Sequence, residues 1–147
     1  MKTRALVMAA VMALTAMATT RVAQAQNAIA VNVPFDFVAG GKALPAGEYA
    51  VRASGAGNTL ILIDRKDASV SALIITHAVV SLDTQKESKL IFNRYGDRYF
   101  LSQVWSEGNS QGRQLLKTAR EKEVALTANI ETEGQVTLVA ELARTNR

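Results

Sequence analysis

The stretch Val33–Val51 reads as strand, turn and strand, and the rest of the chain is predicted to add strands to it. Apolar side chains recur at every second position on both sides of its turns, which is the period of a half-buried strand. The bends come from Gly40-Gly41 and Pro45-Ala46-Gly47, because proline fixes φ and glycine adopts positive φ freely. Pro34 cannot donate to a sheet ladder, so the first strand is expected to lie at a sheet edge or to bend there.

Short apolar segments bounded by turns continue along the chain at spacings near ten residues. The expected strands are residues 29–37, 48–53, 59–63, 69–80, 89–95, 98–105 and 135–143. Gly96-Asp97 between two of them is typical of a tight hairpin, and residues 59–80 are expected to form another. The pattern predicts a mainly β fold, a small antiparallel β-sandwich or barrel of about seven to eight strands with one short helix near the C-terminal end.

The helix is expected within Arg113–Ala128, where alternation fades and straight-chain residues and alanines favour helix. About three turns would fit there, and a strand beginning over residues 114–119 is the competing interpretation. Elsewhere, the strands that hold Ile61, Ile63, Leu73 and Ile75 are apolar at neighbouring positions as well. Such strands predict burial on both faces, or a sheet that something else covers.

The first 25 residues have the features of a Sec-type signal peptide. Lys2 and Arg4 precede a run of Ala, Leu, Val and Met, and Ala23-Gln24-Ala25 supplies the small residues that signal peptidase accepts. The apolar run is shorter than the ~20 residues of a membrane-spanning helix. Cleavage is therefore predicted after Ala25, followed by a single β-rich domain over residues 26–147 with no integral membrane span.

Removing the leader changes the charge and defines the compartment. It carries three of the 17 cationic residues and none of the 13 acidic ones, which leaves the rest of the chain at a formal charge of +1. A nearly neutral domain lacks the positive surface that nucleic acid or anionic lipid requires. The chain has no cysteine, so neither a disulfide nor a lipoprotein anchor is expected. A periplasmic or secreted bacterial protein is predicted.

Most catalytic and metal-binding chemistries lack the residues they need. His77 is the only histidine, so no ordinary zinc site and no cofactor are expected, and it is predicted to be a partly buried structural residue. No nucleophile motif accompanies it. A pair of carboxylates remains possible in principle. However, Asp36, Glu48, Asp64 and Asp67 are expected at turns or on solvent-facing positions, where charges are usually solvated.

The hairpin over residues 89–105 is the densest aromatic segment and the best candidate for a binding surface. Tyr95, Tyr99 and Trp105 would line a groove for a sugar or an apolar ligand, because their rings combine an apolar body with a polar tip. The same rings serve more often as core and cross-strand pairs.

Two resemblances accompany these patterns. The first rests on Phe35, Phe37, Leu44–Val51, Phe92–Ser102, Val104 and Trp105. Together these segments resemble a group of small, functionally uncharacterised exported proteins from environmental Gram-negative bacteria, which implies no activity and no site residues. Leu44–Val51 alone is similar to the turn and strand of transthyretin-like and carboxypeptidase-regulatory-like β-sandwich modules, which implies a β-sandwich.

The sequence therefore predicts a non-catalytic exported protein of the bacterial envelope. We expect it to bind a partner protein of the envelope or a small apolar or glycan ligand, through the sheet edge near Pro34 and the aromatic hairpin. Two alternatives stay open. One is a small outer-membrane β-barrel, for which strands of ~9–11 residues would be needed. The other is an enzyme with an unrecognised carboxylate site.

Overall fold

The computed structural model describes residues 28–54, 57–128 and 133–142. The predicted signal peptide, residues 1–25, and its cleavage position lie outside these residues. None of the helices in the described segments has the length and apolar character of a membrane span.

The described segments contain ten strands and one helix, and the strands form a single sheet. The strands are β1 (Ile29–Val33), β2 (Phe37–Ala39), β3 (Lys42–Leu44), β4 (Gly47–Ser54), β5 (Thr59–Asp64), β6 (Ser71–Val80), β7 (Ser88–Tyr95), β8 (Arg98–Trp105), β9 (Gln111–Leu115) and β10 (Glu133–Leu142), and the helix is α2 (Ala119–Thr127).

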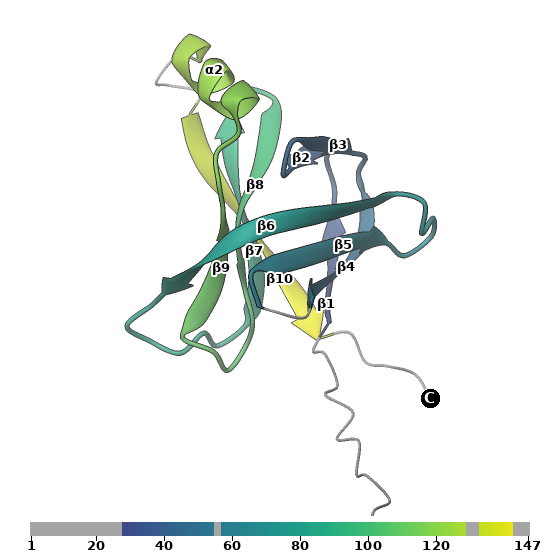
Figure 1. Ribbon diagram of the computed structural model, residues 1–147, viewed down its shortest axis with the longest axis vertical. Coiled ribbons are helices and arrows are strands. Elements are labelled where there is room, and N and C mark those ends of the chain that lie inside the picture. Colours follow the sequence, from purple (N-terminus) through teal and green to yellow (C-terminus); the bar gives the residue numbers. More distant parts are fainter. Residues whose placement is uncertain (1–27, 55–56, 129–132, 143–147) are drawn as a thin grey trace, which may run out of the picture.

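Eight of the strands close into an antiparallel barrel (Figure 1). Their order is β8-β7-β10-β1-β4-β5-β6-β9, and β9 pairs back with β8. The closing pairs are Gln103↔Gln114, Val104↔Arg113 and Trp105↔Gly112. The predicted mainly β fold is confirmed, as a barrel with one short helix near the C-terminal end rather than as a sandwich.

The two ends of the barrel differ. At one end, here called the hairpin end, β2 and β3 form a hairpin and α2 follows β9 (Figure 1). A Cβ built on Gly40 would lie 3.0 Å from Cγ1 of Ile74, so the hairpin turn crosses onto β6. Gly40 and Gly41 have φ of 59° and 87°, the left-handed region that favours glycine. The opposite end, here called the loop end, carries the β6–β7 and β8–β9 loops.

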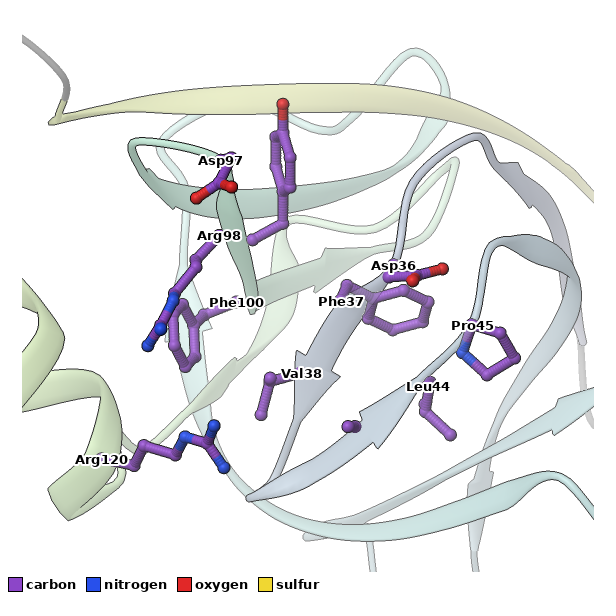
Figure 2. Close-up of a pocket in the computed structure, with 11 residues that line it drawn as sticks. Asp36, Phe37, Val38, Leu44, Pro45, Asp97, Arg98, Phe100 and Arg120 are labelled. Carbon is purple, nitrogen blue, oxygen red and sulfur yellow. The ribbon is translucent and has the colours of Figure 1, made fainter.

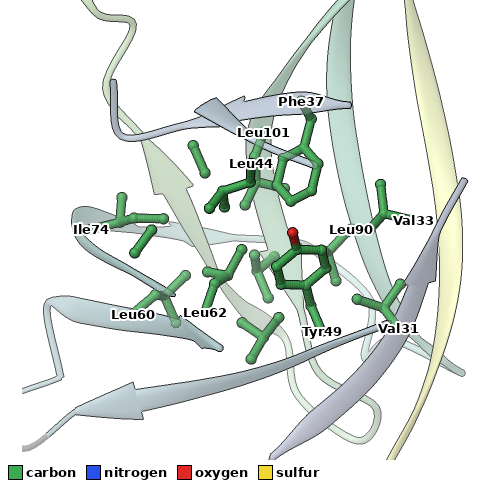
Figure 3. Close-up of a cluster of buried hydrophobic side chains, with 14 of the residues drawn as sticks. Val31, Val33, Phe37, Leu44, Tyr49, Leu60, Leu62, Ile74, Leu90 and Leu101 are labelled. Carbon is green, nitrogen blue, oxygen red and sulfur yellow. The ribbon is translucent and has the colours of Figure 1, made fainter. Parts of the chain in front are cut away.

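The interior of the barrel is packed with apolar side chains (Figure 3). Tyr49, Leu62, Leu90 and Phe92 are fully buried. Each of the two leucines and Phe92 contributes roughly 1.5–3 kcal/mol by leaving water. Because every second residue of each strand points inward, the period-two alternation of the sequence produces this core.

The beginning of the fold differs from the prediction. The expected strand over residues 29–37 is two strands, because the chain bends after β1 at Pro34 and starts β2 at Phe37. β1 pairs with β10 and with β4, so Pro34 follows a strand with neighbours on both sides. The bend was therefore the correct alternative and the sheet edge was wrong. β3 was not predicted, since its three residues read as part of a turn.

Arg113–Ala128 combines both predicted alternatives. Its start belongs to β9, and the helix begins only at Ala119. Thr118 is the N-cap, and its hydroxyl accepts a hydrogen bond from the backbone nitrogen of Glu121 at 3.2 Å. Such a cap satisfies one of the free N–H groups of the first turn and fixes where the helix starts. The predicted short helix is therefore confirmed, in the C-terminal part of the segment in which it was expected.

The prediction that β5 and β6 are buried on both faces was wrong. Leu60, Leu62 and Ile74 point into the core, whereas Leu73 and Ile75 are 69% and 68% exposed. The two strands alternate like the rest of the barrel wall, and no described element lies over the outward side chains of Leu73 and Ile75.

Candidate functional site

A hollow of about 410 Å³ lies at the hairpin end, between the β2–β3 hairpin, the β7–β8 turn and α2 (Figure 2). We call it the rim pocket. It is lined by Asp36, Phe37, Val38, Ala43, Leu44, Pro45, Asp97, Arg98, Tyr99, Phe100 and Arg120. Three segments far apart in the sequence therefore meet here, because the hairpin and the helix are both inserted at the same end of the barrel.

The floor of the rim pocket is apolar and is fixed by strand pairing. β2 pairs in parallel with β8, which sets Val38 beside Phe100 and Phe37 beside Tyr99. Phe100 is almost fully buried, and its ring meets the ring of Tyr95 edge to face with centroids 5.7 Å apart. The floor is therefore part of the barrel wall.

Two arginines enter the rim pocket from different elements. Arg98 begins β8 and Arg120 lies in the first turn of α2. Figure 2 shows both side chains extending toward the ring of Phe100. Within the described residues, neither guanidinium forms a hydrogen bond or an ion pair. Their donors are therefore not used by any acceptor in the part of the chain that the structure describes.

Two carboxylates line the same pocket but do not face each other. An oxygen of Asp36, Oδ1, accepts a hydrogen bond from the backbone nitrogen of Ala46 at 2.9 Å, which secures the turn between β3 and β4. Asp97 lies in the β7–β8 turn, and Figure 2 shows it on another side of the hollow from Asp36. The pair therefore lacks the convergent geometry of an acid and base acting on one bond.

A buried polar network holds α2 against β7 and so places Arg120. Glu121 is 4% exposed, and its Oε1 accepts hydrogen bonds from Asn93 Nδ2 at 2.9 Å and from the Tyr95 hydroxyl at 3.4 Å. Gln135 Nε2 donates to Asn93 Oδ1 at 3.3 Å, and Lys117 Nζ donates to the Tyr95 hydroxyl at 3.2 Å. Glu121 is the only buried side chain of α2, so these hydrogen bonds are the main attachment of the helix.

The three aromatic residues singled out from the sequence do not form one groove. Tyr95 is buried under α2 within the network just described. Tyr99 lines the rim pocket and stacks on Phe35, with ring centroids 3.8 Å apart. Trp105 packs over Gly112 toward the loop end, and its Nε1 donates to Gln103 Oε1 at 2.9 Å. Only Tyr99 stays a candidate ligand contact in the rim pocket.

The remaining polar residues named from the sequence have structural or exposed positions. His77 is exposed on β6, so the prediction of partial burial was wrong. Asp64 lies at the β5–β6 turn, as one of the two expected alternatives had it, but it is buried, and its Oδ1 accepts from the backbone nitrogens of Lys66 and Asp67 at 2.7 and 3.0 Å. Among the described residues, no group of three or more His, Cys, Asp or Glu could hold a metal ion.

Tyr49 connects the β3–β4 turn to the core. Its hydroxyl donates to the backbone oxygen of Pro45 at 2.7 Å. Burial raises the pKa of Tyr49 above its ordinary value, and the nearby carboxylates of Asp64 and Asp36 add to the shift. The residue is therefore a neutral structural anchor of the β3–β4 connection.

Sequence reasoning missed Arg98 and Arg120 as site residues. Both look like ordinary solvated charges in the sequence, and only the tertiary structure brings the β7–β8 turn and α2 together. The one available signal was the presence of Arg98 directly after the predicted Gly96-Asp97 turn.

Comparisons of the chain with protein-family models, with curated proteins and with solved structures give no match. The two resemblances therefore stay predictions.

Proposed function

We propose that the protein is an exported, non-catalytic β-barrel of the bacterial envelope that binds a small dipolar ligand in the rim pocket. The observation that carries this proposal is the pair Arg98 and Arg120, which extend into an apolar-floored hollow without partners among the described residues. Exposed arginines ordinarily extend into water. Two that converge on a buried aromatic ring favour a bound anionic group.

The lining residues define the chemistry of the ligand. An anionic group fits against Arg98 and Arg120, and an ammonium or hydroxyl donor fits near Asp97. The body of the ligand would cover Val38 and Phe100. A hollow of about 410 Å³ lies within the usual range of ~300–1,000 Å³ for small-molecule sites. These features together favour a hydrophobic amino acid or a short peptide over the small apolar or glycan ligand expected from the sequence.

The arrangement of the carboxylates supports binding rather than catalysis. Asp36 is held by the Ala46 amide, and it does not converge with Asp97 on one point of the hollow. Because acid–base chemistry needs groups within hydrogen-bond reach of the same reacting atoms, the enzyme alternative gains no support from this site.

The distribution of side chains across the wall favours an aqueous setting over the outer-membrane alternative. Membrane barrels carry an apolar band outside and polar side chains inside. Here the interior is the apolar core, whereas Glu48, Arg52, Arg94 and Glu141 are exposed. The periplasmic or secreted location rests on the signal peptide predicted from residues 1–25.

A titration with three related probes tests the proposal. Phenylalanine carries both charges, its methyl ester lacks the carboxylate, and 3-phenylpropionate lacks the ammonium group. We expect phenylalanine to shift the backbone amide resonances of Val38, Arg98 and Phe100 saturably, and the ester to bind at least tenfold more weakly, equivalent to about 1.4 kcal/mol. The phenylpropionate should lie between them.

Arg98→Gln and Arg120→Gln should each weaken phenylalanine binding several-fold, and the double variant should abolish it. Lys122→Gln is the matched control, since Lys122 is an exposed cation on α2 that does not line the pocket. Equal affinity for phenylalanine and its ester, or an unchanged double variant, would refute the proposed site.

A further inference from the structure

The loop end of the barrel carries a second hollow, separate from the rim pocket. It has a volume of about 290 Å³ and shares no lining residue with the rim pocket. We call it the loop-end mouth. It opens between the end of β4, the start of β5, the start of β9 and the β8–β9 loop.

The inner end of the loop-end mouth is the barrel core itself. Ile29, Val51, Leu60 and Val104 line it, and all four belong to the buried apolar cluster. Their side chains are aliphatic, so this surface offers dispersion contacts and no hydrogen bonds. An apolar group that entered here would extend the core of the barrel.

The outer end is cationic. Arg52 and Arg113 line the mouth, and no Asp or Glu is among its lining residues. Within the described part of the chain, neither guanidinium has a hydrogen-bond or ion-pair partner. The two positive charges therefore act on the opening without a compensating carboxylate in its lining, in contrast to the rim pocket.

Arg113 reaches across the opening. It lies on β9 beside Val104, and a Cβ built on Gly57 of the β4–β5 turn would lie 3.4 Å from Arg113 Nη2. The side chain is half-buried. Arg113 therefore lines the same opening as the aliphatic floor, and its guanidinium reaches the opposite side of that opening.

One wall of the mouth is preformed. In the β8–β9 loop, the backbone nitrogen of Gly108 donates to the oxygen of Gln85 at 2.9 Å, and Gln85 donates in turn to the oxygen of Asn109 at 3.0 Å. Ser81 donates to the oxygen of Ser110 at 2.8 Å. These bonds tie the loop to the β6–β7 loop, so binding would not need to order it, which reduces its entropic cost.

We infer that the loop-end mouth is a binding site for a small aliphatic carboxylate. Its chain would lie on Ile29, Val51, Leu60 and Val104, and its carboxylate would accept hydrogen bonds from Arg113, with Arg52 adding positive charge. A planar guanidinium matches a carboxylate in two parallel hydrogen bonds. This site is independent of the one proposed for dipolar ligands at the hairpin end.

Hexanoate is the probe, with 1-hexanol and hexylamine as analogues that lack the anionic group. We expect hexanoate to shift the amide resonances of Gly57 and Gly112 saturably, and both analogues to bind at least tenfold more weakly. Arg113→Gln should weaken hexanoate binding at least tenfold, whereas Arg113→Lys should retain part of it. Arg52→Gln, which changes an exposed side chain, should weaken it several-fold with the fold intact.

The Arg98→Gln, Arg120→Gln double variant is the matched control and should bind hexanoate like the unchanged protein, because it alters only the opposite end. Circular dichroism of each variant separates loss of binding from loss of folding. The inference is overturned if hexanol binds as tightly as hexanoate, if folded Arg52→Gln and Arg113→Lys variants bind like the unchanged protein, or if hexanoate shifts only resonances of the rim pocket.

Discussion

At Gly47 the backbone passes so close to a buried side chain that no Cβ fits. A Cβ there would lie 2.8 Å from Oδ2 of Asp64, nearer than real Cβ contacts come. Gly47 is not among the glycines with positive φ, although its place after Pro45 predicted a turn conformation. Its role is steric: it leaves room for the carboxylate that secures the β5–β6 turn.

Gly47→Ala should therefore destabilise the protein by about 1–3 kcal/mol, as overpacking at tight sites does. The added methyl group would displace Asp64 from the backbone nitrogens of Lys66 and Asp67. Urea unfolding followed by Trp105 fluorescence measures the change in the free energy of unfolding.

Gly134→Ala is the matched control, since a Cβ at Gly134 has nothing within 4 Å and its φ is not in the left-handed region. It should leave the stability nearly unchanged. Equal losses for the two variants would show that the proximity of Asp64 to Gly47 has no energetic consequence.

Tyr49 makes stability sensitive to alkaline pH. Its pKa is raised in the folded state, chiefly by burial, so the unfolded chain loses the hydroxyl proton first as the pH rises. The stabilisation is complete below the ordinary tyrosine pKa of about 10 and declines as the pH rises from there through the higher folded value.

Tyr49→Phe should cost about 1 kcal/mol near pH 7, because the hydrogen bond to Pro45 is lost. Above pH 10 the variant should lose stability less steeply than the unchanged protein. Denaturant unfolding between pH 7 and 11 gives both slopes, and parallel curves would contradict the assigned role of burial.

At the scale of single elements, α2 is attached to the barrel by polar groups rather than by an apolar stripe. Its exposed side chains include Arg120, Lys122, Glu123 and Leu126, and only Glu121 is buried. A helix of this length is unstable alone in water, so its position depends on the Thr118 cap and the network with Asn93 and Tyr95.

Glu121→Ala should lower the free energy of unfolding by about 1–3 kcal/mol, because it leaves the buried donors of Asn93 and Tyr95 without their acceptor. It should also speed hydrogen exchange of the α2 amides. Glu123→Ala, an exposed change in the same helix, should do neither. Unchanged exchange in Glu121→Ala would mean that another contact holds the helix.

The elements that could be predicted from the sequence are those with local causes. Gly96-Asp97 between two apolar segments predicted the β7–β8 hairpin, which the structure contains. Gly40-Gly41 predicted a turn, and both glycines have positive φ. β3 was not predicted, because a strand of three residues is too short to show a period-two alternation of apolar and polar side chains. The exposed faces of Leu73 and Ile75 were mispredicted because apolar composition does not say which side of a sheet is covered.

The site depended on tertiary structure and could be predicted only in part. Tyr99 lines the rim pocket, and its role as a ligand contact stays a prediction. Tyr95 was placed in the same group, but the buried carboxylate of Glu121 covers it, and nothing in the sequence relates these two positions. Arg98 and Arg120 meet only because the β7–β8 turn and α2 lie at one end of the barrel.

At the scale of the whole molecule, closure of the sheet into a barrel determines where the core and the two pockets lie. It makes the interior a single apolar core and leaves two chemically different ends. The hairpin end has the β2–β3 hairpin, α2 and a pocket with charges of both signs, and the loop end has an opening lined by arginines alone among charged residues. A closed barrel also removes most strand edges, which protects the fold from edge-to-edge aggregation.

Nuclear Overhauser contacts between the backbones of β8 and β9 test closure most directly. Together with the β6–β9 pairs, the pairs Gln103↔Gln114, Val104↔Arg113 and Trp105↔Gly112 complete the ring. We expect cross-strand contacts at all three pairs and slow exchange of the amides that bridge the two strands. Contacts of β9 with β6 but none with β8, together with fast exchange along that side of β9, would describe an open sheet and contradict the barrel.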